Sequence, residues 1–158
     1  SDLQSFFDRR EIRDMMAYLK AIDNPRDEVS LLRIINIPAR GIGESSTEKI
    51  LQSAVKNGTS FWEVSEQMAE AGTVSAKTRT ALSQFRGLLG RYAGAMHERP
   101  TELASLTRSL LQEINYESEI EKQYKEETQR EVRRNILEEF VSSIGLYAEK
   151  NPRPTLSG

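Results

Sequence analysis

The chain contains no cysteine and a single histidine, His97. The lack of cysteine excludes a disulfide scaffold, thiol catalysis, cysteine-ligated zinc and iron–sulfur clusters. One histidine also excludes a histidine-based metal site and a two-histidine acid–base pair. His97 stands beside Glu98 and Arg99 at an expected helix end, which favours an exposed, structural position. We therefore expect no catalytic residue, no metal site and no cofactor within the chain itself.

Long apolar runs and targeting signals are missing as well. No apolar run approaches the ~20 residues that a membrane span needs. The chain does not begin with the cationic, apolar and small-residue segments of a secretory signal. Neither a Gly-x-x-x-x-Gly-Lys phosphate loop nor a Gly-x-Ser-x-Gly nucleophile elbow occurs. These absences predict a cytoplasmic, non-enzymatic chain without membrane contact.

An excess of charge of one sign is absent too, because 22 basic and 24 acidic residues leave a net charge of −2. The chain as a whole therefore has no electrostatic footprint for nucleic acid. Residues 1–100 carry 14 basic and 13 acidic side chains, whereas residues 101–158 carry 8 and 11. The acidic excess lies mainly between Glu117 and Glu139. A surface that faces DNA is thus expected within the first hundred residues.

Helical spacing of apolar residues runs through most of the chain, and no segment shows a convincing two-residue alternation. The expected helices carry their apolar stripes within 12–22, 29–35, 50–55, 61–68, 82–96, 103–114 and 132–144. Val29, Val55 and Val132 belong to these stripes. Asp27, and Thr59 or Ser60, are expected to cap two of the helices. The pattern predicts one domain over residues 1–158, an all-α orthogonal bundle of about seven or eight helices.

Residues 36–47 interrupt this pattern with the sequence Asn-Ile-Pro-Ala-Arg-Gly-Ile-Gly-Glu-Ser-Ser-Thr. A helix, a short Gly-x-Gly hairpin and a second helix form the arrangement of a helix-hairpin-helix phosphate binder. Gly41 and Gly43 allow a tight turn with positive φ and a close approach of the backbone to a ligand. The following helix presents free amide N–H groups and the positive end of its dipole. Ile42 is expected to point inward and to anchor the hairpin on the core.

The candidate DNA-phosphate site consists of Arg40, Gly41, Ile42, Gly43, Ser45 and Ser46. In this site Ser45 and Ser46 would donate hydrogen bonds, and Arg40 would neutralise charge. Such a site holds one or two backbone phosphates and reads no base, so binding would depend on salt and not on sequence. The competing interpretation is a plain glycine turn before a serine-capped helix. Glu44 argues mildly against an anion here, although a first-turn acidic residue also suits the helix dipole.

Several blocks of the sequence match one protein family in order and spacing. They are Phe6, Phe7, Arg9, Glu11, Ile12 and Asp14; Ala17, Tyr18 and Leu19; Asn24, Pro25 and Asp27; residues 32–36; and residues 38–43. On these blocks the chain resembles the 2B subdomain of UvrD/Rep/PcrA-type superfamily 1 DNA helicases, strongly over its first third and loosely after residue 60. Ser46 and Thr47 stand where the family commonly has threonine and leucine, and Ile37 replaces a frequent threonine.

The resemblance implies that the chain is part of a longer protein, an ATP-dependent 3′–5′ DNA helicase of replication or repair. The 2B subdomain is a helical insertion in a RecA-like motor domain, and residues 151–158 would be the return tail toward that domain. ATP and Mg²⁺ would bind to other domains of the parent. Gly41, Ile42 and Gly43 would contact duplex DNA, and the subdomain would swivel to regulate unwinding.

The same resemblance implies duplex or forked DNA, the other domains of the parent helicase and repair or replication proteins as partners. The subdomain itself would be a monomer in a cytoplasm of bacterial type, associated with the nucleoid. If φ at Gly43 is positive, replacing this residue by valine should abolish duplex binding, because β-branched residues resist that conformation.

Two alternatives remain. The chain could be a protein-docking module of the helicase without DNA contact, with the acidic helices of residues 117–139 as its working surface. It could also be a free-standing helix-hairpin-helix accessory protein of DNA repair. The start within a motif block and the short tail favour a part of a longer chain over this second alternative.

Overall fold

The computed structural model describes residues 2–150. Within that range it contains nine α-helices, one 3-10 helix and no strand, which confirms the all-α prediction. The elements are α1 (Asp2–Phe7), α2 (Arg10–Asp23), α3 (Glu28–Ile34), α4 (Glu44–Asn57), α5 (Phe61–Glu70), α6 (Ala76–Glu98), η1 (Pro100–Glu102), α7 (Leu103–Glu113), α8 (Tyr116–Gln123) and α9 (Glu127–Lys150). The expected return tail over residues 151–158 lies outside the described residues. None of the described helices is both long and apolar enough to cross a membrane.

The structure contains two helices, α1 and α8, that the apolar spacing does not predict. Arg9 is extended, with φ −69° and ψ 139°, and separates α1 from α2. Asn115 has φ 54° and separates α8 from α7. With 6 and 8 residues, the two helices have too few turns to show a periodic stripe in the sequence.

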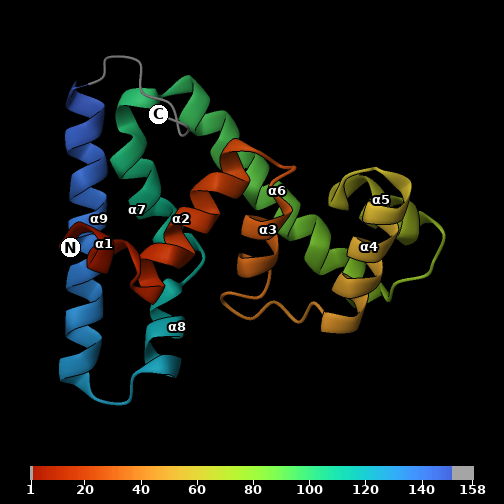
Figure 1. The fold of residues 1–158 in the computed structure, drawn as a ribbon, viewed down its shortest axis with the longest axis horizontal. Coiled ribbons are helices and arrows are strands. Elements are labelled where there is room, and N and C mark those ends of the chain that lie inside the picture. Colours follow the sequence, from red (N-terminus) through yellow and green to blue (C-terminus); the bar gives the residue numbers. More distant parts are fainter. Residues whose placement is uncertain (1, 151–158) are drawn as a thin grey trace.

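The long helix α6 crosses the molecule (Figure 1). One of its ends contacts α7 and η1, and its other end lies beside the α4–α5 pair. On the opposite side of the molecule α9 runs next to α7 and α8, and α2 and α3 lie between these two parts. Since α2 packs against α3, α6 and α9, it joins the two sides of the fold.

The apolar stripe of α6 lies in the core as predicted. Its residues Leu82, Phe85, Leu89, Tyr92 and Met96 are each at most 6% exposed. The ring of Trp62 in α5 lies 6.1 Å from the ring of Phe85, measured between centroids. The stripe therefore also contacts α5, and this apolar contact helps to stabilise that end of the molecule.

Three valines expected within apolar stripes lie instead at the surface. Val29 is 84% exposed, Val55 72% and Val132 51%. Helical spacing identifies residues that share a face, but the neighbouring element decides which face is covered. In α3, for example, Leu31 and Ile34 face the core and Val29 does not.

Two buried carboxylates of α2 tie this helix to its neighbours. Asp14 accepts hydrogen bonds from Arg33 Nε at 3.0 Å and from the Tyr116 hydroxyl at 2.6 Å. Burial and the neighbouring carboxylate raise the pKa of Tyr116 well above its ordinary value, so its hydroxyl remains a donor. Glu11 accepts from Tyr124 at 2.9 Å and from Arg133 at 3.1 Å. These contacts join α2 to α3, α8 and α9.

Replacing Asp14 by alanine should strongly destabilise the fold. The substitution leaves the Arg33 guanidinium and the Tyr116 hydroxyl without their acceptor in a buried site, which costs about 3–5 kcal/mol of unfolding free energy. Urea unfolding followed by circular dichroism measures this loss. Asp8→Ala is the control, because Asp8 is exposed and its loss should change stability by less than about 0.5 kcal/mol. Similar losses in the two variants would contradict the role given to Asp14.

Candidate nucleic-acid interface

The turn between α3 and α4 contains both glycines of the predicted hairpin, and the two differ in conformation. Gly41 has φ +76°, in the region that favours glycine, as predicted. Gly43 has φ −66° and ψ 142°, so the expectation of a positive φ at this residue is wrong. The physical reason is its position, because Gly43 is the N-cap of α4, where the backbone is extended and accessible to any residue. The sequence-based prediction for Gly43→Val assumed a positive φ at this residue, so the structure removes the reason first given for a loss of duplex binding.

An asparagine that the sequence analysis did not single out holds the turn together. The Asn36 side chain donates from Nδ2 to the carbonyl oxygen of Ile42 at 2.6 Å. Its Oδ1 accepts from the backbone N–H of Arg40 at 3.3 Å and of Ile42 at 3.2 Å. An asparagine directly after a helix is the sequence signal for such a bridge, because its amide both donates and accepts.

Ile42 anchors the turn in the core. Its side chain is 3% exposed, which confirms the inward orientation expected for it. Gly41 and Gly43, on either side, are exposed. The backbone of the turn is therefore accessible from solvent on both sides of an apolar anchor.

The guanidinium of Arg40 is engaged within the protein. It donates from Nη1 to the carbonyl oxygens of Ile34 at 2.8 Å and Ile35 at 3.1 Å, and from Nη2 to the Tyr18 hydroxyl. Its carbon Cζ lies 4.3 Å from the centroid of the Phe85 ring. Arg40 thus caps the C-terminus of α3. Its positive charge remains beside the turn, but its strongest donors already have acceptors.

The first turn of α4 leaves its amide groups without a side-chain cap. Gly43 has no side chain, and the first intrahelical hydrogen bond of the helix runs from Thr47 N to Gly43 O at 3.0 Å. The N–H groups of residues 44–46 therefore have no partner within the helix. Three other helices differ, because Asp27, Ser60 and Ser75 cap α3, α5 and α6. Ser45 is exposed and Ser46 half-buried, so the structure brings both predicted hydroxyls to this end of α4.

A lysine from α6 completes the surroundings of the turn. A Cβ atom at residue 41 would lie 3.3 Å from Lys77 Cε and 3.7 Å from Lys77 Nζ. The exposed ammonium of Lys77 thus lies directly beside Gly41. No local sequence signal could have pointed to Lys77, because only the packing of α6 brings it to the turn.

A groove of about 480 Å³ continues from the turn along α6. Its lining residues come from the turn (Pro38, Ala39 and Arg40), from α6 (Ala81, Gln84, Phe85, Gly87, Leu88 and Arg91) and from the end of α7 (Glu113 and Ile114). Arg91 Nη2 forms an ion pair with Glu113 Oε2, and the hydrogen bond from Arg91 lowers the pKa of Glu113. The Tyr92 hydroxyl donates to Glu113 Oε1 at 2.9 Å, and burial helps to raise the pKa of Tyr92 to about 12.

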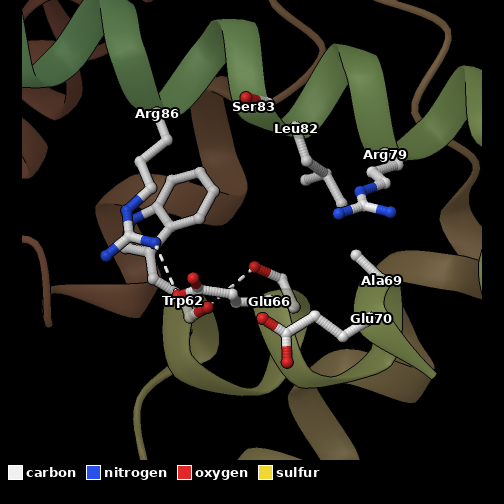
Figure 2. Close-up of a pocket in the computed structure, with 9 residues that line it drawn as sticks. Trp62, Glu66, Ala69, Glu70, Arg79, Leu82, Ser83 and Arg86 are labelled. Carbon is white, nitrogen blue, oxygen red and sulfur yellow. Dashed lines mark hydrogen bonds and ion pairs between the residues drawn. The ribbon is translucent and has the colours of Figure 1, made fainter.

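A second, smaller pocket of about 200 Å³ lies between α5 and α6. Figure 2 shows Arg79 and Arg86 reaching from α6 toward this pocket and toward α5. Arg86 pairs with Glu66 at 3.4 Å and lies over the ring of Trp62, 5.7 Å from its centroid. The basic residues of α6 are therefore divided between two sides of the helix.

Comparisons with known proteins cover nearly the whole chain. The model of the UvrD-like helicase C-terminal domain family matches residues 1–156. The chain is 34% identical over 151 residues to the ATP-dependent DNA helicase PcrA of Bacillus subtilis, covering 96% of this chain and 20% of that protein. It is 32% identical to PcrA of Staphylococcus epidermidis and 30% identical to PcrA of Staphylococcus aureus, each over 94% of this chain and 20% of the relative. The chain thus spans about a fifth of the length of these relatives.

Substitution of the two glycines by alanine should have different effects on stability. Gly41→Ala forces a Cβ into the left-handed region and against Lys77, which should cost about 1–2 kcal/mol of unfolding free energy. Gly43→Ala should cost less, about 0.5–1 kcal/mol for a poorer N-cap, because its backbone is extended and its Cβ would lie 3.8 Å from Ser46 Oγ. Urea unfolding of the two variants measures the difference. A larger loss for Gly43→Ala would contradict the backbone geometry described for the turn.

Proposed function

Because the chain belongs to the UvrD-like helicase C-terminal domain family, we propose that it is the 2B subdomain of a UvrD/Rep/PcrA-type ATP-dependent 3′–5′ DNA helicase. In this role it is a non-catalytic, regulatory part of the parent protein. It contacts the backbone of duplex DNA, orients the duplex against the motor and swivels to regulate unwinding. ATP and Mg²⁺ bind to other domains, in keeping with the lack of a phosphate loop in this sequence. Its partners are duplex or forked DNA, those other domains, and proteins of repair or replication.

The uncapped first turn of α4 carries the proposal of a DNA contact. A helix N-terminus with unpaired N–H groups favours a phosphate through hydrogen bonds and through the helix dipole. Here Ser45 and Ser46 lie at the same end of the helix, and the preceding Gly41 and Gly43 are exposed. The ammonium of Lys77 adds a positive charge beside the turn. Contacts of this kind hold phosphates without reading bases.

The alternative of a protein-docking module receives less support from the structure. Its working surface would be the acidic residues between 117 and 139. Several of these carboxylates are paired with arginines, since Arg134 binds Glu117, Glu127 and Glu131, and Glu138 pairs with Arg108. Such pairs reduce the negative field that a basic partner would recognise.

Replacing Gly43 by valine tests the proposed contact. The extended backbone at this residue accepts valine, so the variant should keep the fold, with a loss of about 1 kcal/mol for a poorer N-cap. The branched side chain would stand beside the free N–H groups and keep a phosphate at a distance. Duplex binding, measured by fluorescence anisotropy between 50 and 200 mM salt, should weaken by about tenfold or more, equivalent to about 1.4 kcal/mol or more.

The matched control is Gly90→Val, since Gly90 is exposed on α6 and a Cβ there would meet nothing within 4 Å. It should bind the duplex like the unaltered chain. In a nuclear magnetic resonance titration, which detects millimolar affinities, the duplex should shift the backbone N–H signals of residues 44–46. A folded Gly43→Val variant with unchanged affinity, or unshifted signals at a saturating duplex concentration, would refute the contact at α4.

A further inference from the structure

Helix α6 is positively charged in a chain that is otherwise negative. It carries four lysine or arginine residues and one glutamate, whereas the rest of the chain carries eighteen basic and twenty-three acidic residues. The acidic residue, Glu98, stands at its last position. Nearly the whole length of α6 therefore presents basic or neutral side chains.

The polar residues of α6 divide into two sides according to helical spacing. Lys77, Gln84 and Arg91 follow one another at intervals of seven residues, which places them on one side of the helix. Arg79 and Arg86 lie on the other side, where both line the pocket against α5 (Figure 2). Arg86 is paired there with Glu66.

The side with Lys77 is continuous with the turn between α3 and α4. Lys77 lies against Gly41, and Gln84 and Arg91 line the groove whose other wall is formed by Pro38, Ala39 and Arg40. The small residue Ala81 and the apolar side chain of Leu88 lie between them along α6. A chain-like ligand that reaches the turn can thus continue along α6 over Ala81 and Leu88.

The charge of this groove suits an anion. Among the described residues that line it, Arg40 and Arg91 are cationic and Glu113 is the one carboxylate. Glu113 is itself paired with Arg91. With Lys77 at the end beside the turn, the positive charges outnumber the negative one along the whole surface.

We propose that Lys77, Gln84 and Arg91 form a second phosphate-binding surface, the α6 track, which holds the backbone of the same DNA duplex beyond the turn. This inference rests on the proposed function and extends it.

Lys77 and Arg91 are about 21 Å apart along the helix axis, at 1.5 Å per residue. One strand of a duplex laid along that length presents about six phosphates, at 3.4 Å of helix axis each. Lys77, Gln84 and Arg91 can contact about three of these phosphates, which adds to the one or two held at the turn.

Lys77→Gln and Arg79→Gln test the track as a matched pair. The two residues are two positions apart on α6, both are exposed, and each substitution removes one positive charge. Lys77→Gln should weaken duplex binding. It should also make the negative slope of log K, the association constant, against log salt less steep by about 0.9, the value of one phosphate contact. Its loss of affinity should then be about threefold larger at 50 mM than at 200 mM salt. Arg79→Gln should leave the slope unchanged.

Glu113→Gln should have the opposite effect and strengthen duplex binding. The substitution removes the carboxylate of the groove and frees Arg91, while its amide oxygen can still accept from Tyr92. The control is Glu66→Gln, which also removes a carboxylate paired with an arginine of α6, but on the side away from the track. If Glu113→Gln gains affinity for the duplex and Glu66→Gln does not, the gain cannot come from a purely structural role of Glu113.

The outcomes separate the track from the contact at α4. If Gly43→Val loses duplex binding while Glu113→Gln binds like Glu66→Gln, the track is refuted and the proposed function stands. If Glu113→Gln strengthens binding and Gly43→Val changes nothing, the contact at α4 is refuted and the track stands. If the duplex shifts the signals neither of residues 44–46 nor of residues 77, 84 and 91, both the contact at α4 and the track are refuted. A polyglutamate peptide that shifts the track signals when the duplex does not would assign the surface to an acidic protein instead.

Discussion

The arrangement of the turn depends on the guanidinium of Arg40. A helix leaves its last carbonyl groups without partners, and one planar cation with several donors can satisfy more than one of them. Arg40 does so for Ile34 and Ile35 at the end of α3, and it also reaches Tyr18 of α2 and the ring of Phe85 in α6. Because Arg40 belongs to the turn itself, these contacts fix the turn on three helices at once. The turn that precedes the backbone amides of α4 is therefore held by contacts with α2, α3 and α6.

Helix α6 combines three roles on three sides. Its apolar stripe lies in the core, Arg79 and Arg86 face α5, and Lys77, Gln84 and Arg91 lie toward the turn and its groove. A helix can serve three neighbours in this way because residues three or four positions apart share a side, while intermediate residues point elsewhere. The result is a basic surface on a chain of net charge −2. The overall composition does not reveal this surface.

In the proposed role, the affinity of each contact can be modest. The chain spans about a fifth of its relatives, which are named as ATP-dependent DNA helicases. If other parts of a longer protein hold the DNA, the contacts of this domain become intramolecular and act at a millimolar effective concentration. A few phosphates at the turn and along α6 can then orient a duplex without binding it tightly. Weak contacts also release readily, as a domain that swivels requires.

The sequence by itself determined the helical class, the cap at Asp27, the choice of Thr59 or Ser60 as the cap of α5, the buried stripe of α6 and the inward position of Ile42. All of these follow from local rules, because spacing, capping and the preference of an apolar side chain act within a few residues. Only the tertiary structure decided the contact of Arg40 with Tyr18 and Phe85, the contact of Lys77 with Gly41 and the exposure of Val29 and Val55. These features depend on which elements pack together. Residues far apart in the chain meet only when helices such as α2, α3 and α6 assemble, so no local pattern encodes their contacts.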